Sequence, residues 1–366
     1  MPQSLVGRML DDLDTPALCI DLDRLQSNIQ AIAGLCQKNG IAWRPHAKGH
    51  KCPAIAHEQL RAGAIGATCA KLGEAEVLAQ NGVHDLLVAN LVVGERKWER
   101  AAALTRWADP IITIDHFVQA EGLSRTCEAR GTRIRVVIEV DIGLDRVGVQ
   151  PGRDTLQLAQ AIDKLPGLKL AGVMGYEGHL LKLPDVAEKD RKIREAIATL
   201  VSCKDLLTKS GLNCEIVSCG GTGSMFHTVA CPGITEIQAG GGIFMDGMYS
   251  DKCGVTDLDF AMSVYATVVS RPRKGKAYLD LGRKSISMEL GPARILGYPG
   301  AEVRAMSAEH CEVLLDEQSE NLKIGDRVRV LVGYHDWTVV LHDTFFGLRG
   351  DRIETVWPIL ARGAMQ

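Results

Sequence analysis

Eight short apolar runs alternate with longer helical patterns between about residues 40 and 245. Short runs rich in β-branched residues predict strands, and apolar residues spaced three and four apart predict helices between them. Strands that alternate with helices lie parallel in one sheet, so eight such units predict an α/β fold with a closed (β/α)8 barrel of the TIM type. An open doubly wound sheet is the alternative, but no Gly-x-Gly-x-x-Gly motif follows the first run. The predicted strands are Ile41–Trp43, Ala67–Cys69, Asp85–Ala89, Ile111–Ile114, Ile134–Ile142, Leu168–Met174, Glu215–Val217 and Glu236–Gln238.

The pattern changes after about residue 260, where strand-like runs follow one another without long helices between them. Such a succession predicts a second, mostly β domain. A further strand-like run, Thr15–Leu22, precedes a helix predicted over Asp23–Cys36 with an Asp at its N-cap, and it could join the β domain or lead into the barrel. The runs after residue 260 are Val264–Val269, Ala277–Leu281, Val328–Val332, Thr338–Leu341 and Ile353–Trp357.

The chain length of 366 residues also favours two domains, because a single hydrophobic core usually stops growing at about 250–300 residues. We expect the barrel domain over residues 24–258. The β domain is expected to combine residues 1–23 with residues 259–366.

Composition argues against two classes of partner. The net charge of -3, with Lys and Arg scattered along the chain, offers no field that favours nucleic acid. No apolar stretch approaches the roughly 20 residues that cross a bilayer, and the N-terminus lacks a basic region followed by an apolar run. Eleven cysteines without a C-x-x-C pair indicate reduced, mostly buried thiols. We therefore expect a cytoplasmic protein that acts on a small molecule.

The octapeptide Arg44–Lys51 places Lys48 between two histidines directly after the first predicted strand. In an extended segment, His46, Lys48 and His50 point to the same side. A lysine crowded by potential cations loses proton affinity, and a neutral amine can attack an aldehyde to form a Schiff base. Lys48 is therefore a candidate cofactor anchor. A solvated basic loop, or a histidine pair for a metal, is the alternative.

Other polar groups follow later strands of the predicted barrel, where the carboxyl ends of the strands gather catalytic groups. A single polar loop residue is usually only solvated, but the repeated placement indicates a site. The groups are Cys69–Lys71, Asp141–Arg146, Tyr176, Glu177 and His179.

Glycine-rich loops follow the last two predicted strands, at Ser218–Ser224 and Gln238–Gly242. Glycines let backbone N–H groups converge on anionic oxygens, and the loops after the seventh and eighth strands of such barrels commonly bind phosphate. Ordinary tight turns are the alternative. Neither loop continues into Gly-Lys-Ser/Thr, so nucleoside triphosphate chemistry is disfavoured.

A Schiff-base lysine and a phosphate cradle in one barrel together suggest pyridoxal 5'-phosphate (PLP). With the motifs given at the end of this paragraph, the chain resembles the D-threonine aldolase and D-serine dehydratase family of PLP enzymes, which has the alanine-racemase-type fold (PLP fold type III). The glycine loop and the Trp-Pro ending resemble the aldolase branch most, including 3-hydroxy-D-aspartate aldolase. The motifs are Thr15–Ala17, Arg44–Lys51, Gly73–Glu76, Gly220–Ser224, Phe244–Asp246 and Val356–Pro358.

The resemblance implies that Lys48 holds PLP as a Schiff base. It further implies that Tyr176 lies near the pyridine nitrogen, and that Arg146 contacts the cofactor or braces its loop. His46 could pack near the ring or tune Lys48. The residues that the family pattern assigns to the phosphate are Gly221, Thr222, Gly240 and Gly241.

The reaction that the resemblance implies is retro-aldol cleavage of a D-configured β-hydroxy amino acid, of the D-threonine or 3-hydroxyaspartate type, to glycine and an aldehyde. A base must remove the proton of the β-hydroxyl group. His179 or His335 could supply that base. The family forms homodimers, so a homodimer is expected.

The family also uses a divalent metal such as Mn, Mg or Zn, held by a His-x-Asp pair in the β domain. In this chain Tyr334 stands at the position of the histidine, and Asp336 keeps the second position. His335 would face the opposite way in a regular strand, but a bulge could bring it round. Asp336 and His335 are therefore the candidate ligands, and ordinary strand or turn residues without a metal are the alternative.

Three other functions fit parts of the pattern. A D-serine or 3-hydroxyaspartate dehydratase would keep PLP and release water, although such members tend to carry a His-x-Cys pair where Asp336 stands. A racemase would need a second acid or base on the other cofactor face, for which Tyr249 is the candidate. A non-catalytic PLP-binding protein is the last.

Overall fold

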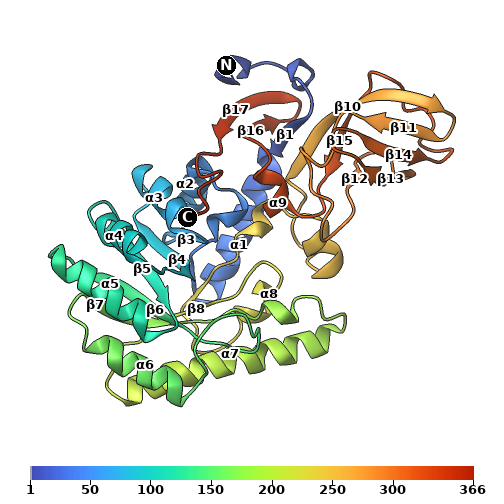
Figure 1. Ribbon diagram of the computed structural model, residues 1–366. Helices are drawn as coiled ribbons and strands as arrows, with labels where there is room; N and C mark the ends of the chain where they lie inside the picture. Colours follow the sequence, from blue (N-terminus) through green and yellow to red (C-terminus); the bar gives the residue numbers. More distant parts are fainter. Residues whose placement is uncertain (1) are drawn as a thin grey trace. The chain divides into compact units, whose positions relative to one another are not determined.

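The computed structural model describes residues 2–366, and the chain separates into two compact units. One unit combines Met1–Gln30 with Gly241–Arg362 and is called the β unit below. The other combines Ala31–Gly240 with Gly363–Gln366 and is called the barrel unit. Figure 1 shows the elements of both units in chain order by colour.

The barrel unit contains one sheet of eight parallel strands in the order β2-β9-β8-β7-β6-β5-β4-β3. All eight predicted strands are present, which confirms the (β/α)8 prediction. The strands are β2 (Ala42–Trp43), β3 (Ala67–Cys69), β4 (Asp85–Leu91), β5 (Asp109–Ile114), β6 (Ile134–Glu139), β7 (Leu168–Met174), β8 (Ile216–Cys219) and β9 (Glu236–Ile237).

The residues around β2 close this sheet into a barrel. On one side β2 pairs with β9, and the Trp43 indole N–H donates to the Ala239 carbonyl at 2.7 Å. On the other side His46 forms a parallel bridge with Thr68 of β3, whose N–H donates to the Pro45 carbonyl at 2.9 Å. The two edge strands are thus joined through one segment of about five residues.

A buried ion pair reinforces the closure. The Arg44 side chain is 2% exposed, and its Nε donates to both carboxylate oxygens of Glu236 on β9 at 3.0 and 3.1 Å. Its Nη1 lies 2.8 Å from Oδ1 of Asp85 on β4. Because a buried guanidinium without partners would cost several kcal/mol, these two carboxylates hold Arg44, and therefore the end of β2, in one place.

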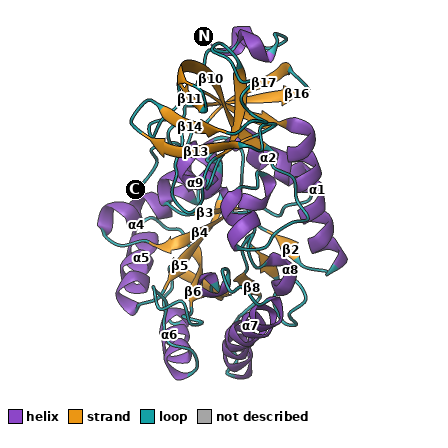
Figure 2. Cartoon of the chain, turned by 90° about the vertical axis from the view of Figure 1, so that its right-hand side faces the viewer, coloured by secondary structure: helices purple, strands orange, loops and turns teal. Residues whose placement is uncertain are grey.

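Amphipathic helices cover the outside of the barrel strands, as Figure 2 shows for α4 to α7. The longest, α7, begins after Asp185, whose side chain accepts from the Glu188 N–H, and Gly211 follows its end at a φ of 78°. The helices of this unit are α2 (Pro53–Arg61), α3 (Leu72–Gln80), α4 (Glu95–Leu104), α5 (Phe117–Ala129), α6 (Arg153–Asp163), α7 (Val186–Lys209) and α8 (Met225–Thr228).

The β unit contains a sheet of nine strands. Six of them close into a ring in the order β10-β15-β12-β13-β14-β11, because β11 pairs with both β14 and β10. The N-terminal strand β1 pairs with β10 and, in parallel, with β16. The strands are β1 (Ala17–Asp21), β10 (Met262–Arg273), β11 (Lys276–Leu279), β12 (Arg294–Ile295), β13 (Ala301–Met306), β14 (Cys311–Leu315), β15 (Arg327–Leu331), β16 (Thr344–Arg349) and β17 (Arg352–Pro358).

Two local predictions differ from the structure. The strand predicted over Thr338–Leu341 is wrong, because a short helix, α9 (His335–Val339), includes its first two residues and a turn follows. The helix predicted over Asp23–Cys36 is α1 (Leu22–Lys38), and the carboxylate that accepts from its first turn is Asp21, which receives the Arg24 N–H at 3.1 Å. Within residues 2–366, no helix is long and apolar enough to cross a membrane.

Candidate functional site

The segment that carries Lys48 turns instead of remaining extended. Ala47–Gly49 forms a single 3-10 turn, η3, and Nδ1 of His46 accepts from the Lys48 N–H at 3.4 Å. His50 is buried, and its Nδ1 accepts from the Cys52 N–H at 3.0 Å. The extended alternation predicted for this segment is therefore wrong beyond His46. His46 and Lys48 are half-buried at the carboxyl end of β2, while His50 belongs to the interior.

The second lysine of the octapeptide is committed to an ion pair. Lys51 contacts Oε1 of Glu74, and both side chains are buried. Oε2 of Glu74 accepts from the Ala70 and Lys71 N–H groups at 2.6 and 3.1 Å. Because its amine is buried against Glu74, Lys51 is poorly placed to react with an aldehyde. Lys48 is the amine of this segment that remains suited to hold an aldehyde.

Glycines at the ends of β8 and β9 make room for neighbouring backbone and for an aromatic ring. A Cβ atom on Gly240 would lie 2.2 Å from the His46 carbonyl oxygen, so only glycine lets the two strand ends approach this closely. A Cβ on Gly221 would lie 3.1 Å from Cε2 of Tyr176, and one on Gly178 would lie 2.6 Å from Cε1 of the same ring. The Tyr176 ring therefore lies against two glycines.

The loop after β8 is held by its own hydrogen bonds. The Gly221 N–H donates to Oγ of Ser224 at 3.1 Å, and the Ser224 N–H donates to the Gly221 carbonyl at 3.1 Å. Gly220 has a φ of 75°, which favours glycine. Gly221 thus supplies space for Tyr176 while its N–H closes the turn, and Thr222 is buried within the loop.

Arg146 is placed on an exposed loop after β6, with 59% of its side chain exposed. Its guanidinium lies 3.8 Å from Glu139. Asp141 organises the loop, because its Oδ1 accepts from the Gly143 and Asp145 N–H groups at 2.9 and 3.1 Å. Although partial burial opposes it, these N–H groups lower the pKa of Asp141. Asp141 therefore braces this loop through its backbone N–H groups.

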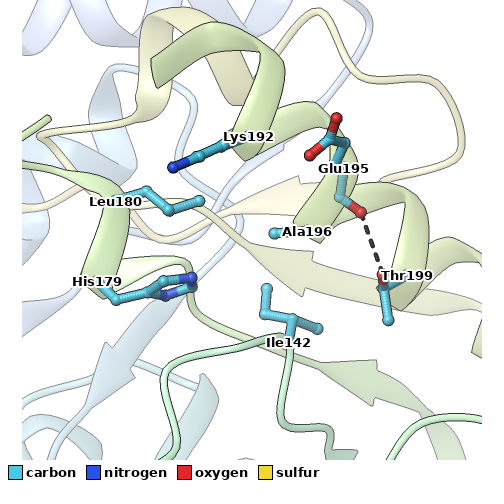
Figure 3. Close-up of a pocket in the computed structure, with 7 residues that line it drawn as sticks. All are labelled: Ile142, His179, Leu180, Lys192, Glu195, Ala196 and Thr199. Atoms are coloured by element: carbon cyan, nitrogen blue, oxygen red, sulfur yellow. Dashed lines mark hydrogen bonds between the residues drawn. The ribbon is translucent and has the colours of Figure 1, made fainter. Parts of the chain in front are cut away.

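His179 is exposed on the short turn η4 (Gly178–Leu180) after β7, and it lines a cleft of about 410 Å³ (Figure 3). In this view the Leu180 side chain lies between the imidazole and Lys192, and Ile142 lies to the right of the ring. A Cβ on Gly143 would lie 3.0 Å from Nε2 of His179, so the β6 loop approaches the ring closely. The cleft is lined by Ile142, His179, Leu180, Lys192, Glu195, Ala196 and Thr199.

In the β unit, His335 is held by a buried carboxylate that the sequence interpretation did not assign. Oδ2 of Asp246 accepts from the His335 backbone N–H at 3.0 Å and from its Nδ1 at 2.6 Å. Oδ1 of Asp246 accepts from the Tyr249 N–H at 2.9 Å. Both Asp246 and His335 are fully buried. A Cβ on Gly241 would lie 2.7 Å from Cε1 of His335, so this glycine borders the imidazole.

Asp336 lies on the other side of the imidazole. Its Oδ1 is 3.0 Å from Nε2 of His335, and its Oδ2 accepts from the Tyr334 hydroxyl at 2.8 Å. Burial alone would lower the pKa of His335, but the hydrogen bond to Asp246 and the nearby Asp336 raise it to about 9. The three residues converge because helix α9 begins at His335, so Tyr334, His335 and Asp336 do not alternate as in a strand.

The residues of the barrel unit fit PLP. Lys48 can supply the amine for a Schiff base, and Gly221 and Gly240 add no side chains to the loops after β8 and β9. Both glycines lie at the carboxyl ends of strands, where ligands of such barrels bind. The backbone turn over residues 220–224 is preformed.

His335 and Asp336 fit a divalent cation. Nε2 of His335 is buried and lies 3.0 Å from Oδ1 of Asp336. That arrangement allows one cation to contact both atoms, while Asp246 on Nδ1 is the outer carboxylate usual for a metal-bound histidine. Nowhere in residues 2–366 do three or more His, Cys, Asp or Glu side chains form a metal-binding group, so the site offers two such ligands.

Comparisons with known proteins place this architecture among PLP enzymes. Residues 20–247 match the family model of the alanine racemase N-terminal domain, and residues 261–348 match a putative serine dehydratase domain. The chain is 35% identical to the D-threonine aldolase of Arthrobacter sp, over 99% of this chain and 96% of the relative. A crystal structure of D-threonine aldolase from Filomicrobium marinum superposes with a TM-score of 0.96 at 35% identity, over 99% of this chain and 98% of that chain.

Two further relatives act on hydroxyaspartate, according to their names. The 3-hydroxy-D-aspartate aldolase of Paracoccus denitrificans (strain Pd 1222) is 30% identical over 98% of this chain and 95% of the relative. The D-threo-3-hydroxyaspartate dehydratase of Delftia sp. (strain HT23) is 32% identical over 77% of this chain and 75% of the relative. The similarity therefore includes aldolases and a dehydratase.

Glu139, the last residue of β6, is only 5% exposed. Burial raises its pKa to about 7, although Arg146 opposes the shift. Above the unfolded pKa the folded protein binds more protons at this group, so stability should fall as pH rises from about 4.5 to 7. Glu139→Gln removes this dependence. Its stabilising effect on the free energy of unfolding should be about 2 kcal/mol larger at pH 8 than at pH 5.

Urea unfolding at the two pH values measures the difference. The matched control is Glu215→Gln, because the Glu215 side chain is 52% exposed in the same unit. An equal effect of Glu139→Gln at both pH values would contradict the prediction.

Proposed function

The chain belongs to the D-threonine aldolase branch of the alanine-racemase-type PLP enzymes, and we propose on that basis that it cleaves a D-configured β-hydroxy amino acid to glycine and an aldehyde. The observation that carries the proposal is the position of Lys48 in the turn after β2, next to His46, whose carbonyl oxygen would lie 2.2 Å from a Cβ on Gly240 after β9. D-threonine and D-3-hydroxyaspartate are the candidate substrates, because similar relatives carry these names.

Lys48 is proposed to anchor PLP through its amine, and when bound PLP supplies an electron sink for the pair released at Cα. Tyr176 is proposed to lie at the pyridine nitrogen. A neutral phenol there would leave the ring nitrogen less protonated than a carboxylate would, which moderates the sink. His46, which caps the turn that carries Lys48, is proposed to fix the orientation of the amine. Arg146 is proposed as a cofactor contact from the β6 loop.

His179 is proposed as the base. It takes the proton from the substrate β-hydroxyl group while the Cα–Cβ bond breaks, so that the β-carbon leaves as an aldehyde. The electron pair of the broken bond stays on Cα, which then accepts a proton to give glycine. An imidazole on the turn after β7 is suited to this exchange, because histidine is the side chain used most often for general acid–base catalysis.

His335 and Asp336 are proposed to bind a divalent cation such as Mn, Mg or Zn. Asp246 holds Nδ1 of His335, so Nε2 is the nitrogen available to a cation. With two protein ligands the cation keeps several open positions, and moderate affinity is expected. Tyr334 donates to Asp336 and is proposed to orient that carboxylate.

A dehydratase is the second candidate function, and similarity to the D-threo-3-hydroxyaspartate dehydratase supports it. The same substrate would then lose water and ammonia and yield a keto acid. Product analysis separates the two functions without any assumption about mechanism.

The proposed reaction predicts glycine and an aldehyde in equal amounts when the purified protein with PLP is given D-threonine or D-3-hydroxyaspartate. Lys48→Ala should lower the rate by roughly a thousandfold or more, because the covalent anchor is lost. Lys182→Ala is the control, since Lys182 is an exposed lysine of the same unit. A keto acid with ammonia as the main product, or a borohydride-reducible PLP adduct retained in Lys48→Ala, would contradict the proposal.

The proposed cation site predicts binding of Mn²⁺ by the chelator-treated protein, followed as loss of the free Mn²⁺ signal in electron paramagnetic resonance. His335→Ala and Asp336→Ala should abolish this binding, because each removes one of two ligands. His342→Ala is the control: this histidine contacts the Ser285 carbonyl at 2.7 Å in the same unit. Wild-type binding by His335→Ala would disprove the ligand assignment.

We further propose that the protein is a cytoplasmic homodimer. All eleven cysteines are free and ten are buried, as expected where thiols stay reduced. The dimer is proposed from the family pattern. Light scattering of the purified protein should give a mass near twice the chain mass of 39.6 kDa, and the monomer mass at micromolar concentration would contradict it.

A further inference from the structure

A buried carboxylate, Glu177, supports the loop after β8 from behind. Its side chain is fully buried directly after Tyr176. Oε1 accepts from the Ser224 hydroxyl at 2.6 Å and from the Thr228 hydroxyl at 2.9 Å. Oε2 accepts from the Gly220 N–H at 3.3 Å. Glu177 therefore contacts the first residue of the loop, Gly220, its last residue, Ser224, and Thr228 in the helix α8 that follows.

The contacts impose a direction on the hydrogen bonds of the loop. Because the Ser224 hydroxyl donates to Glu177, its oxygen is left to accept from the Gly221 N–H. The chain of bonds runs from Gly221 through Ser224 to the carboxylate. Such bonds strengthen one another in a buried environment, and the ionised end makes them stronger than neutral pairs.

Burial of a carboxylate here needs a reason, because a carboxylate that loses water without full compensation is costly. Glu177 accepts from the N–H of Gly220, the hydroxyl of Ser224 and the hydroxyl of Thr228 at the end of α8. A neutral side chain could fill the same space at lower cost. The charge is therefore best explained by the shape that it imposes on residues 220–228.

We propose that Glu177 is a positioning residue for the cofactor phosphate, acting through the loop Gly220–Ser224 without touching the cofactor. The proposal rests on the PLP site proposed above. The neighbouring residue adds a second connection, because the Tyr176 ring lies against Gly221 of the same loop. Two consecutive residues that follow β7, Tyr176 and Glu177, thus both contact the loop.

Comparison of PLP with pyridoxal tests the proposal, because pyridoxal lacks the phosphate and can still react with Lys48. Both are titrated into cofactor-free protein and followed by the change in visible absorbance. Glu177→Ala should weaken PLP binding about ten- to a hundredfold, as expected for hydrogen bonds to a charged group. Its pyridoxal affinity should stay near that of the wild type.

One milder variant and a matched control keep the test informative if Glu177→Ala folds poorly. Thr228→Val removes one hydroxyl donor to Glu177 and should weaken PLP binding severalfold with little effect on pyridoxal. Thr155→Val is the matched control, because Thr155 on α6 is as buried as Thr228. Its hydroxyl donates to the Gln150 carbonyl at 2.7 Å, away from Glu177. Circular dichroism establishes that each variant is folded.

Equal weakening of PLP and pyridoxal in Glu177→Ala and Thr228→Val would overturn the proposal, since a general loss of structure would explain it. Unchanged PLP affinity in both variants would also overturn it. A wild-type protein that prefers PLP over pyridoxal but shows no lyase activity would contradict the proposed function and leave the role of Glu177 standing.

Discussion

The closure of the barrel at residues 42–46 is the constraint on which the rest of the site depends. Strand β2 is only two residues long, yet it pairs with β9 and continues into a bridge with β3. The buried Arg44 forms ion pairs with Glu236 and Asp85, and these contacts fix the register of the short strand β2 against its neighbours. Lys48 follows within one turn, so the position of the amine is set by the same contacts that close the sheet.

Close approach of backbone then brings the other parts of the barrel site together. Gly240 lets the end of β9 touch the His46 carbonyl, and Gly221 lets the loop after β8 touch the Tyr176 ring. Glu177 holds that loop through three hydrogen bonds. In the β unit, Asp246 plays a comparable part for His335. In both places a buried carboxylate orients a group that is proposed to meet a ligand.

Sequence patterns located the elements whose signal is local. The eight barrel strands were predicted because short β-rich runs alternate with helical periods, and the glycine loops were predicted from composition alone. The strands β12 to β14 and β16 were missed. Strand β12 has only two residues, β13 and β14 mix charged and apolar side chains, and the strand predicted over Thr338–Leu341 was placed just before β16. The segment after Tyr334 was assigned to a strand, although a helix begins at His335, whose backbone N–H and Nδ1 donate to Asp246, almost ninety residues earlier.

The sequence by itself determined the (β/α)8 class, the candidate amine at Lys48 and the two glycine loops, because each depends on residue type and spacing over a short stretch. Only the tertiary structure decided that Lys51 forms an ion pair with Glu74 and that His335 faces Asp336. It also decided that the buried carboxylates of Glu177 and Asp246 accept hydrogen bonds from Ser224 and His335. These assignments depend on partners distant in sequence. Burial and hydrogen-bond direction, which decide them, exist only once the chain has folded.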